Sequence, residues 1–291
     1  MSDNISIEEG VVCGTRGSRD LCCDIYTPAG ASNAPAVLVL YGGGWRMGER
    51  SRVREACLSL ARRGFVAIAG EYRLTPEAAW PAQIHDVKAT IRWIRANAAR
   101  LNINPSKIAA QGHSAGAHLA MLAAGTPNLP EFEGDGGNPG VSTELAAVVG
   151  IYPPVVFQPG EEKVSGSVPA KALMGSAATE ELARAASPIT YASASYPPAF
   201  MLHGTSDKVV PVSATLRMCE ALTAARAHVE MHIYADLPHG FARVGSLQDQ
   251  LQEEIASFLR RTMVEPEAFK RELEEYAAQA LAARKEVPLP A

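Results

Sequence analysis

Short runs of consecutive apolar residues alternate along this chain with longer segments in which apolar residues recur every three or four positions. A strand that is apolar at successive positions is covered on both faces, whereas the three-to-four spacing marks one buried face of a helix. This rhythm predicts an α/β fold, with a mostly parallel central sheet and helices on both faces. We expect strands at 36–41, 65–69, 107–111, 145–151, 198–203 and 229–234, and helices at 50–63, 82–99, 115–124 and 246–260.

The rest of the chain is arranged around this sheet. Residues 11–26 predict an antiparallel hairpin at its edge. Residues 1–262 are expected to form a single domain, in which 153–196 is a small lid-like insertion between strands. After it, residues 263–291 predict a C-terminal helical extension with apolar side chains along one face. That helix either docks on its own domain or contacts a second copy in a homodimer, and the sequence leaves both arrangements open.

Charge and composition argue against several classes of protein. Lys and Arg number 27 and Asp and Glu 31, a net charge of −4, whereas nucleic-acid binders carry a basic surface. No apolar run reaches the length of about 18 residues typical of a transmembrane helix, so no membrane association is expected. The first residues, Met1–Asn4, show no signal-peptide pattern, and the five cysteines include no C-x-x-C pair. We therefore expect a cytoplasmic protein with free thiols and no metal site.

The strongest functional signal is the pentapeptide GHSAG at 112–116, which follows a predicted strand and opens a predicted helix. A serine hydroxyl is an effective nucleophile only where a tight turn exposes it beside a base. Such a turn brings backbone segments close together, so Gly112 and Gly116 must lack side chains. The pattern G-x-S-x-G in this setting predicts that Ser114 is a nucleophile. We expect the side chain of His113 to point away from the cleft.

A second signal, YGGGW at 41–45, comes directly after the first strand of the alternating series. Consecutive glycines let backbone amides face a ligand without a Cβ in the way, and in this position they predict an oxyanion hole. We expect its donors to be the amides of Gly43, Gly44 and Ala115. A plain glycine turn is the alternative. A dinucleotide-binding loop is disfavoured because the spacing is not G-x-G-x-x-G.

A base and an acid follow in later loops. His239 comes after the predicted strand 229–234, and Asp207 after 198–203. The carboxyl ends of parallel strands meet at one edge of a sheet, so both residues are expected near Ser114. In such a site the histidine moves the proton, and the carboxylate orients the imidazole. Asp236 is a rival acid, but its proximity to His239 in sequence does not favour it, because the partners come from separate loops.

Together these motifs resemble a known family. The chain is similar to the serine esterases of the α/β-hydrolase superfamily, in the group related to hormone-sensitive lipase and to the small bifunctional feruloyl and acetylxylan esterases. The blocks that carry the resemblance are Tyr41–Trp45, Glu71–Glu77, Trp80–Gln83, Asp86, Gly112–Gly116, Ser187-Pro188, His203–Asp207 and His239–Phe241.

The resemblance implies a carboxylic ester hydrolase that acts on small to medium acyl esters through an acyl-enzyme, without a cofactor. Its implied partner is a small-molecule ester. It implies that the nucleophile, acid and base are Ser114, Asp207 and His239, and that the oxyanion donors are the amides of Gly43, Gly44 and Ala115. The residues it implies as supports of the oxyanion loop are Tyr72, Arg73, Glu77 and Asp86.

One departure from the family concerns the oxyanion motif, which usually begins with histidine and here begins with Tyr41. A phenol is larger, so it either braces the loop in another way or reaches into the cleft. Tyr41, Trp45 and Tyr72 are therefore candidates for the substrate pocket. In the predicted insertion, Phe157, Leu173, Met174 and Tyr191 either line an acyl or leaving-group pocket or take part in ordinary packing of the insertion, which is favoured.

Two other functions stay open at this point. Related folds cleave aryl formamides or peptides with the same Ser-His-Asp machinery, so an amide or formamide hydrolase is the main alternative. A non-catalytic ligand-binding protein on a hydrolase fold is disfavoured. Such proteins lose the nucleophile or the base, and this chain has both.

Overall fold

The computed structural model describes residues 4–16, 19–75, 77–159 and 166–285. In this part of the chain the central sheet has eight strands. β1 pairs antiparallel with β2, and β2 antiparallel with β4, while the remaining neighbours are parallel. The order across the sheet is β1 (Ile5–Arg16), β2 (Arg19–Pro28), β4 (Val66–Gly70), β3 (Ala34–Leu40), β5 (Ile103–His113), β6 (Ala147–Ile151), β9 (Ala199–Gly204) and β10 (Val229–Tyr234).

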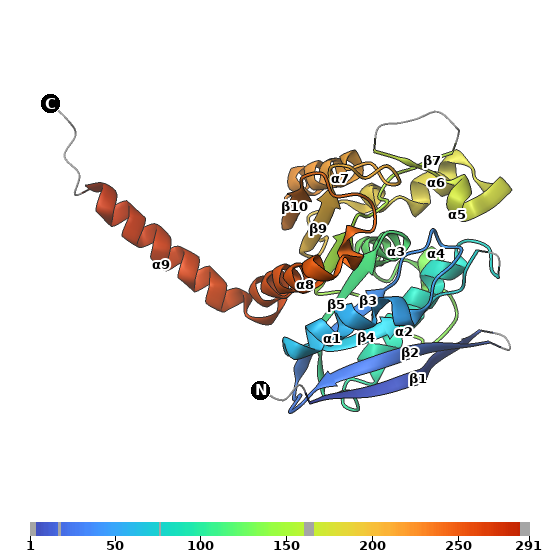
Figure 1. Ribbon diagram of the computed structural model, residues 1–291, viewed down its shortest axis with the longest axis horizontal. Coiled ribbons are helices and arrows are strands. Elements are labelled where there is room, and N and C mark those ends of the chain that lie inside the picture. Colours follow the sequence, from blue (N-terminus) through green and yellow to red (C-terminus); the bar gives the residue numbers. More distant parts are fainter. Residues whose placement is uncertain (1–3, 17–18, 76, 160–165, 286–291) are drawn as a thin grey trace.

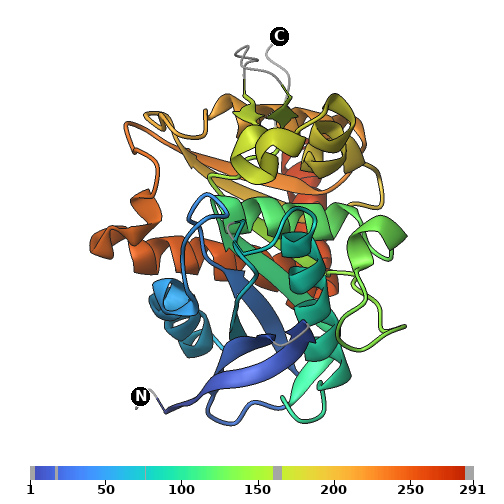
Figure 2. The ribbon, with the colours of Figure 1, turned by 90° about the vertical axis from the view of Figure 1, so that its right-hand side faces the viewer.

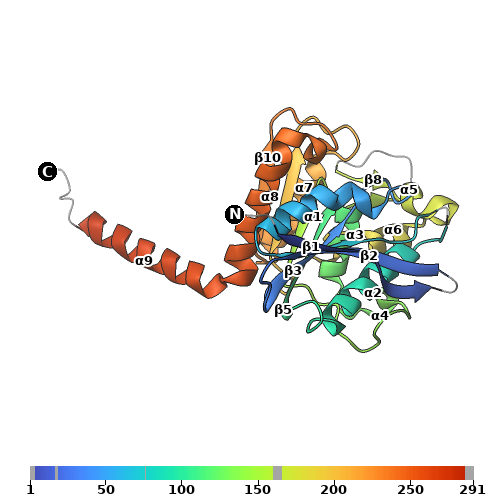
Figure 3. The ribbon, with the colours of Figure 1, turned by 60° about the horizontal axis from the view of Figure 1, so that its bottom comes forward.

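Helices cover both faces of this sheet. On one face, α1 (Arg54–Arg62), preceded by the 3₁₀ turn η1 (Arg50–Val53), packs against α8 (Gly245–Leu259). On the other, α2 (Ala82–Ala96) packs against α3 (Ala115–Gly125). Figure 3 shows α1 and α8 on one side of the strands and α2 on the other. The predicted fold class is confirmed.

Burial explains why the inner strands read as continuous apolar runs. Every residue of β4, β6 and β9 is buried, because helices cover both faces. The edge strand β10 instead alternates between more and less exposed side chains. The predicted strands and helices are all present within a few residues of their expected bounds, and the predicted hairpin extends over the whole of β1 and β2. One further helix, α7 (Ser213–Ala224), is not among the elements predicted from the sequence; it packs against β9 and β10.

The predicted insertion lies between β6 and β9, and residues 160–165 of it fall outside the described residues. Figure 2 shows this segment, in yellow, beside α3. Its described elements are β7 (Phe157–Gln158), β8 (Val168–Pro169), α5 (Lys171–Met174), η2 (Gly175–Ala177), α6 (Glu180–Ala186) and η3 (Pro188–Tyr191); before β6 there is a short α4 (Pro130–Glu133).

The C-terminal part runs from η4 (Phe241–Arg243) through α8 and the π-helical turn η5 (Arg260–Val264) to α9 (Pro266–Lys285). Figures 1 and 3 show α9 projecting away from the rest of the molecule. Among the described residues, no helix combines the length and the apolar character that crossing a bilayer requires. The division into a domain over 1–262 and an extension over 263–291 stays a prediction.

Candidate active site

Ser114 occupies a strained turn between β5 and α3. Its φ is 52°, a left-handed value that few non-glycine residues adopt. A Cβ at Gly112 would lie 2.2 Å from the carbonyl oxygen of Gly116, and a Cβ at Gly116 only 2.5 Å from that of Leu40. Both positions therefore require glycine, as the motif predicts. The Ser114 amide donates to the carbonyl oxygen of Ile151 at 2.9 Å, which ties the turn to the neighbouring strand β6.

The structure brings Ser114, His239 and Asp207 together from three loops at the carboxyl edge of the sheet. Ser114 Oγ lies 3.0 Å from His239 Nε2, and His239 Nδ1 lies 2.6 Å from Asp207 Oδ2. The loops that carry the acid and the base touch at Gly204, where a Cβ would lie 2.1 Å from the carbonyl oxygen of Leu237. Residues 125 positions apart in the chain thus share a hydrogen bond.

The carboxylate of Asp207 is fully enclosed and well supplied with donors. Its Oδ1 accepts from the amides of Val209 and Val210 at 2.8 and 2.9 Å, and its Oδ2 lies 3.3 Å from His203 Nε2. Burial alone would raise the pKa of Asp207, but the hydrogen bonds from His203, His239 and these amides outweigh it and hold the pKa well below its ordinary value. The acid is therefore ionised at neutral pH.

The rival acid, Asp236, makes no such contact. It is exposed, and its printed hydrogen bond is made by its backbone amide, which donates to Thr205 Oγ1 at 2.8 Å. Its φ of 59° places it in a left-handed turn after β10. The carboxylate beside His239 is thus that of Asp207, from the separate loop after β9.

The glycine loop after β3 lies against the serine. A Cβ on Gly42 would be 3.1 Å from Ser114 Cβ. Gly43 has a φ of 143°, and a Cβ there would lie 1.8 Å from the carbonyl oxygen of Met47. In the described part of the chain, the amides of Gly43 and Gly44 donate to no protein acceptor. They are therefore available to a ligand, as is the amide of the first residue of α3, since helix N-termini leave such groups unpaired.

Tyr41 braces this loop through a reciprocal pair with Tyr72. The Tyr41 hydroxyl donates to the Tyr72 carbonyl oxygen at 3.3 Å, and the Tyr72 hydroxyl donates to the Tyr41 carbonyl oxygen at 2.9 Å. The two rings stack with centroids 4.7 Å apart. Burial raises the pKa of Tyr41 to about 12, so its hydroxyl remains a neutral donor. Tyr72, predicted as a pocket candidate, is fully buried behind Tyr41 and is not among the residues that line the cavity.

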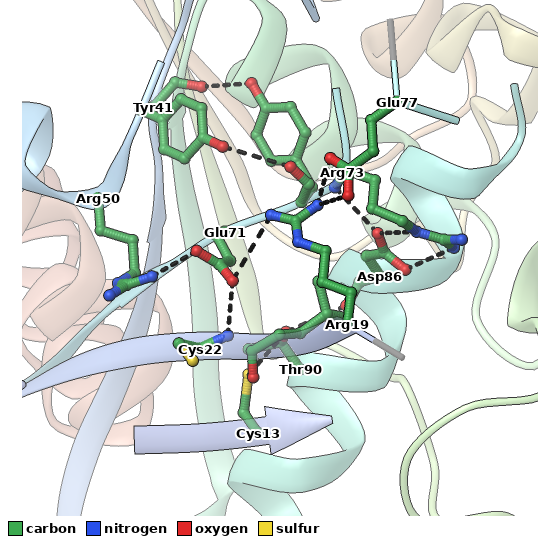
Figure 4. A network of polar contacts seen from close by, with 12 residues as sticks. Cys13, Arg19, Cys22, Tyr41, Arg50, Glu71, Arg73, Glu77, Asp86 and Thr90 are labelled. Atoms are coloured by element: carbon green, nitrogen blue, oxygen red, sulfur yellow. Dashed lines mark hydrogen bonds and ion pairs between the residues drawn. The ribbon is translucent and has the colours of Figure 1, made fainter. Parts of the chain in front are cut away.

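A network of ion pairs holds the segment that contains Glu71 and Arg73 (Figure 4). Arg73 binds Asp86 with both arms, from Nε to Oδ2 and from Nη2 to Oδ1, each at 2.8 Å. Arg19, on β2, pairs with Glu77 and lies 3.8 Å from Glu71. None of these residues lines the cavity. They affect the site only by holding the backbone near Tyr72 in place.

His118 links three parts of the site, a role that the sequence analysis missed. Trp45 Nε1 donates to His118 Nδ1 at 3.1 Å, and His118 Nε2 donates to the carbonyl oxygen of Ala186 at 2.8 Å. One ring nitrogen accepts and the other donates, so the imidazole is neutral. Burial lowers its pKa to about 4. His118 thereby connects the glycine loop, the serine helix and the insertion. In sequence it is one polar residue in an apolar helix, and no motif marks it.

A cavity of about 480 Å³ opens beside Ser114. Tyr41 and Trp45 line it. His113 is also among the lining residues, but its ring is buried: Nδ1 lies 3.5 Å from the Tyr152 hydroxyl, and Nε2 has no partner among the described residues. Tyr152, which the sequence analysis also missed, lines it with its ring centroid 4.5 Å from that of His239.

The insertion contributes to the cavity with other residues than expected. Val168, Pro169 and Ala172 line it. The four residues named from the sequence take the favoured alternative and pack in or against the core; Phe157, for example, lies with its ring centroid 4.9 Å from that of His118. The predicted candidates that are absent from the cavity lining among the described residues are Phe157, Leu173, Met174 and Tyr191.

Comparison with known proteins places this site in a family. The model of the BD-FAE family, the group of bifunctional feruloyl and acetylxylan esterase-like proteins, matches residues 23–222. The chain belongs to the BD-FAE family. The match covers the glycine loop, Ser114 and Asp207, and the resemblance seen in the sequence is confirmed.

Relatives of this BD-FAE chain include a probable carboxylic ester hydrolase, LipM, from Mycobacterium tuberculosis. The two are 34% identical over 231 residues, which cover 73% of this chain and 51% of LipM. Esterase LipC of the same organism is 33% identical over 257 residues, covering 82% of this chain and 61% of LipC. The chain thus spans between half and two thirds of the length of these curated relatives.

Among solved structures, the esterase Est2 of the planctomycete Thermogutta terrifontis is similar, with a TM-score of 0.74 and 29% identity; the match covers 88% of this chain and 91% of Est2. Other structures of Est2 contain bound propionate or butyrate, and in another it is phosphorylated by paraoxon. A truncated carbohydrate esterase from gut microbiota matches with a TM-score of 0.79 and 28% identity, covering 91% of this chain and 99% of that one.

Proposed function

We propose that this protein is a serine carboxylic ester hydrolase that acts on small to medium acyl esters through an acyl-enzyme. The observation that carries the proposal is the continuous chain of hydrogen bonds from Ser114 Oγ through the His239 ring to Asp207. Ser114, at the start of this chain of hydrogen bonds, lines a cavity beside the unpaired amides of Gly43 and Gly44. A nucleophile, a base and oxyanion donors are the three parts that acyl transfer requires.

In the first half of the reaction, Ser114 Oγ attacks the ester carbonyl carbon while His239 Nε2 accepts its proton. The amides of Gly43, Gly44 and Ala115 stabilise the oxyanion of the tetrahedral intermediate. The charge of Asp207 stabilises the imidazolium that forms. His239 then gives the proton to the departing alcohol, which leaves the acyl group on Ser114.

In the second half, water attacks the acyl-enzyme with His239 as base, and the acid is released. No cofactor enters either half. The names of the relatives support this proposal, as do the Est2 complexes with short carboxylic acids and the Est2 paraoxon adduct.

The proposal is tested with purified protein and three substrate classes: p-nitrophenyl esters of increasing acyl length, N-formylkynurenine and a peptide amide. We expect short esters to give the highest kcat/KM and Ser114→Ala to lower kcat by about 10⁶. A fluorophosphonate probe should label the wild type and spare Ser114→Ala. Ser195→Ala, which removes an exposed hydroxyl outside the cavity, serves as the control. A dominant rate on the formamide or the peptide would replace the ester assignment, and full ester turnover by Ser114→Ala would refute the mechanism.

We propose further that the protein is cytoplasmic, binds neither nucleic acid nor membranes, and forms a homodimer through α9. Leu273 and Tyr276 of that helix are 52% and 71% exposed, and α9 projects from the body. Light scattering should report a dimer for the wild type and a monomer for a Leu273→Glu, Tyr276→Glu variant. A monomeric wild type would remove the dimer from the proposal without affecting the chemistry.

A further inference from the structure

The cavity beside Ser114 has a charge opposite to that of the whole chain. Arg52 of η1 and Arg243 of η4 line it, and among the described residues no aspartate or glutamate does. The net charge of the chain is −4. The nearest carboxylate in the site, that of Asp207, lies behind His239 and is already bonded to two amides and two histidines. The cavity wall is thus cationic in an acidic protein.

Arg52 differs from the arginines on either side of it. Arg50 Nε lies 3.1 Å from Asp24 Oδ1, and Arg54 Nη1 lies 2.7 Å from Glu9 Oε1. In the part of the chain that the structure describes, the guanidinium of Arg52 has neither an ion-pair nor a hydrogen-bond partner. Arg50 and Arg54 are therefore paired with carboxylates, whereas Arg52, an exposed residue that lines the cavity, is not.

Arg243 is likewise unpaired within the described ranges, and its charge acts on the catalytic end of the cavity. Its Nη2 atom lies near Gly240, the residue after His239: a Cβ on that glycine would be 2.9 Å from it. Burial and, as a smaller cause, the Arg243 charge lower the pKa of His113 to about 4. The field of this guanidinium therefore reaches the residue next to Ser114.

The α8 side of the cavity adds polar groups without partners. Gln248 and Gln252 lie four positions apart on α8, so they share one face of the helix, and both line the cavity. Gln252 is only 4% exposed, and its Oε1 has no hydrogen-bond partner among the described residues. A buried amide of this kind is costly unless something bonds to it. Val53 and Ala56, from η1 and α1, line the cavity as well.

We infer that this cavity selects esters that carry a second, anionic oxygen group, a carboxylate bound by Arg52 and Arg243 beside the α8 glutamines. The inference rests on the proposed esterase activity and names its substrate class. A guanidinium presents its donors in a planar fork that matches the two oxygens of a carboxylate. A neutral acyl chain of the same length offers no acceptor to either guanidinium, and both guanidiniums, which are exposed, stay with solvent.

Two matched substrate pairs test the inference. Methyl hydrogen glutarate and methyl pentanoate differ in having a carboxylate or a methyl group at the end of the acyl chain. 4-Acetoxybutanoate and butyl acetate differ in the same way on the alcohol side. We expect the charged member of one pair to have at least about tenfold higher kcat/KM, in line with a charge-assisted hydrogen bond, and the advantage to shrink as salt is added. Equal rates within both pairs would overturn the inference.

Variants assign the effect to the cavity. Arg52→Gln and Arg243→Gln should each lower the charged-to-neutral ratio of kcat/KM by about tenfold, and their combination should abolish it. Arg184→Gln removes an exposed arginine that does not line the cavity, and it should leave the ratio as it is. A double variant that keeps the full ratio would contradict the inference.

A binding measurement separates this inference from the proposed activity. Calorimetry with Ser114→Ala should show tighter binding of the preferred charged ester than of its neutral partner, whether or not the wild type turns either over. If no ester is hydrolysed but this difference in binding appears, the proposed function fails and the anionic subsite stands. If esters are hydrolysed but binding is equal, the subsite is refuted and the proposed function stands.

Discussion

The two ends of the active-site cavity differ in how their polar groups are satisfied. At the end nearest β5 and β9, Asp207 has donors on both oxygens, and His239 is bonded through both ring nitrogens. At the end formed by η1, η4 and α8, Arg52 and Arg243 have no partner among the described residues, and Gln252 Oε1 is unbonded. The polar groups of the first end are bonded within the protein, whereas those of the second have no protein partner among the described residues.

The roles that we propose follow this difference: the groups bonded within the protein carry out the chemistry, and the groups without protein partners choose the substrate. Catalytic groups gain from being fixed before the substrate arrives, because no reorganisation is then needed in the transition state. Groups that recognise part of a substrate must keep their hydrogen-bonding capacity free until it binds. Changes at the first end should therefore alter rate, and changes at the second should alter selectivity or stability.

After the loss of Ser114 itself, the largest effect is expected at the acid. Asp207→Asn keeps the shape but removes the charge that orients and stabilises the His239 imidazolium, so kcat should fall by about 10⁴. Steady-state kinetics on p-nitrophenyl acetate measure it, with Asp236→Asn as the matched control in the neighbouring loop. A larger loss in Asp236→Asn than in Asp207→Asn would show that Asp236, and not Asp207, is the acid.

The next effect concerns the glycine loop. An alanine at Gly43 would place its Cβ 1.8 Å from the Met47 carbonyl oxygen, whereas at Gly44 a Cβ meets no atom within 4 Å. Gly43→Ala should therefore misplace the oxyanion amides and lower kcat by about 10² or more. Gly44→Ala is strained by the left-handed φ of 59° but meets no clash, so it should lose less than Gly43→Ala. Equal losses in the two variants would show that the geometry of Gly43 does not matter to the reaction.

A smaller effect is expected at Tyr41, which holds the loop from behind. Its hydroxyl bonds to the Tyr72 backbone, so Tyr41→His should keep kcat/KM within about tenfold, or roughly 1.4 kcal/mol. Tyr41→Phe, which retains the stacked ring, should lose less. A fall of several hundredfold in a variant with an unchanged circular dichroism spectrum would show that the phenol contacts the substrate.

Acid titration tests the fixed end through stability. The pKa of Asp207 is depressed in the folded state, so the group stabilises the fold above its ordinary pKa of 3.8, and this contribution is lost as the pH falls below that value. Urea unfolding at pH 5, 4 and 3 should show the wild type losing more stability than Asp207→Asn over this range. If the free energy of unfolding fell equally with pH in both proteins, the pKa of Asp207 would not be depressed in the folded state.

The smallest effect is expected at the unpartnered end. Gln252→Leu removes a buried amide whose oxygen has no partner, so the free energy of unfolding should stay within about 1 kcal/mol of the wild type or rise. Gln111→Leu is a matched comparison, because both amide atoms of that buried side chain are also unbonded among the described residues. A loss of several kcal/mol in Gln252→Leu would show that its amide is already satisfied in the empty cavity.

Much of the architecture could be predicted from the sequence because the signals are local. Continuous apolar runs marked the strands covered on both faces, and two glycines around Ser114 marked a turn whose close contacts admit no side chain. The residues Asp207 and His239 could be named because each directly follows a strand, and the carboxyl ends of parallel strands share one edge of the sheet.

What only the tertiary structure decided concerns contacts between segments distant in the chain. His118 bonds to Trp45 and Ala186, which are 73 and 68 positions away, and no local pattern encodes such a contact. Tyr72 was expected in the pocket, but the ring of Tyr41 stacks over it. Ion pairing of the arginines likewise depends on the tertiary structure, because the carboxylates that bind them come from other helices and strands. The sequence determines which segments are strands, helices and tight turns, because neighbouring residues set those, while side-chain pairing is set by packing across the whole fold.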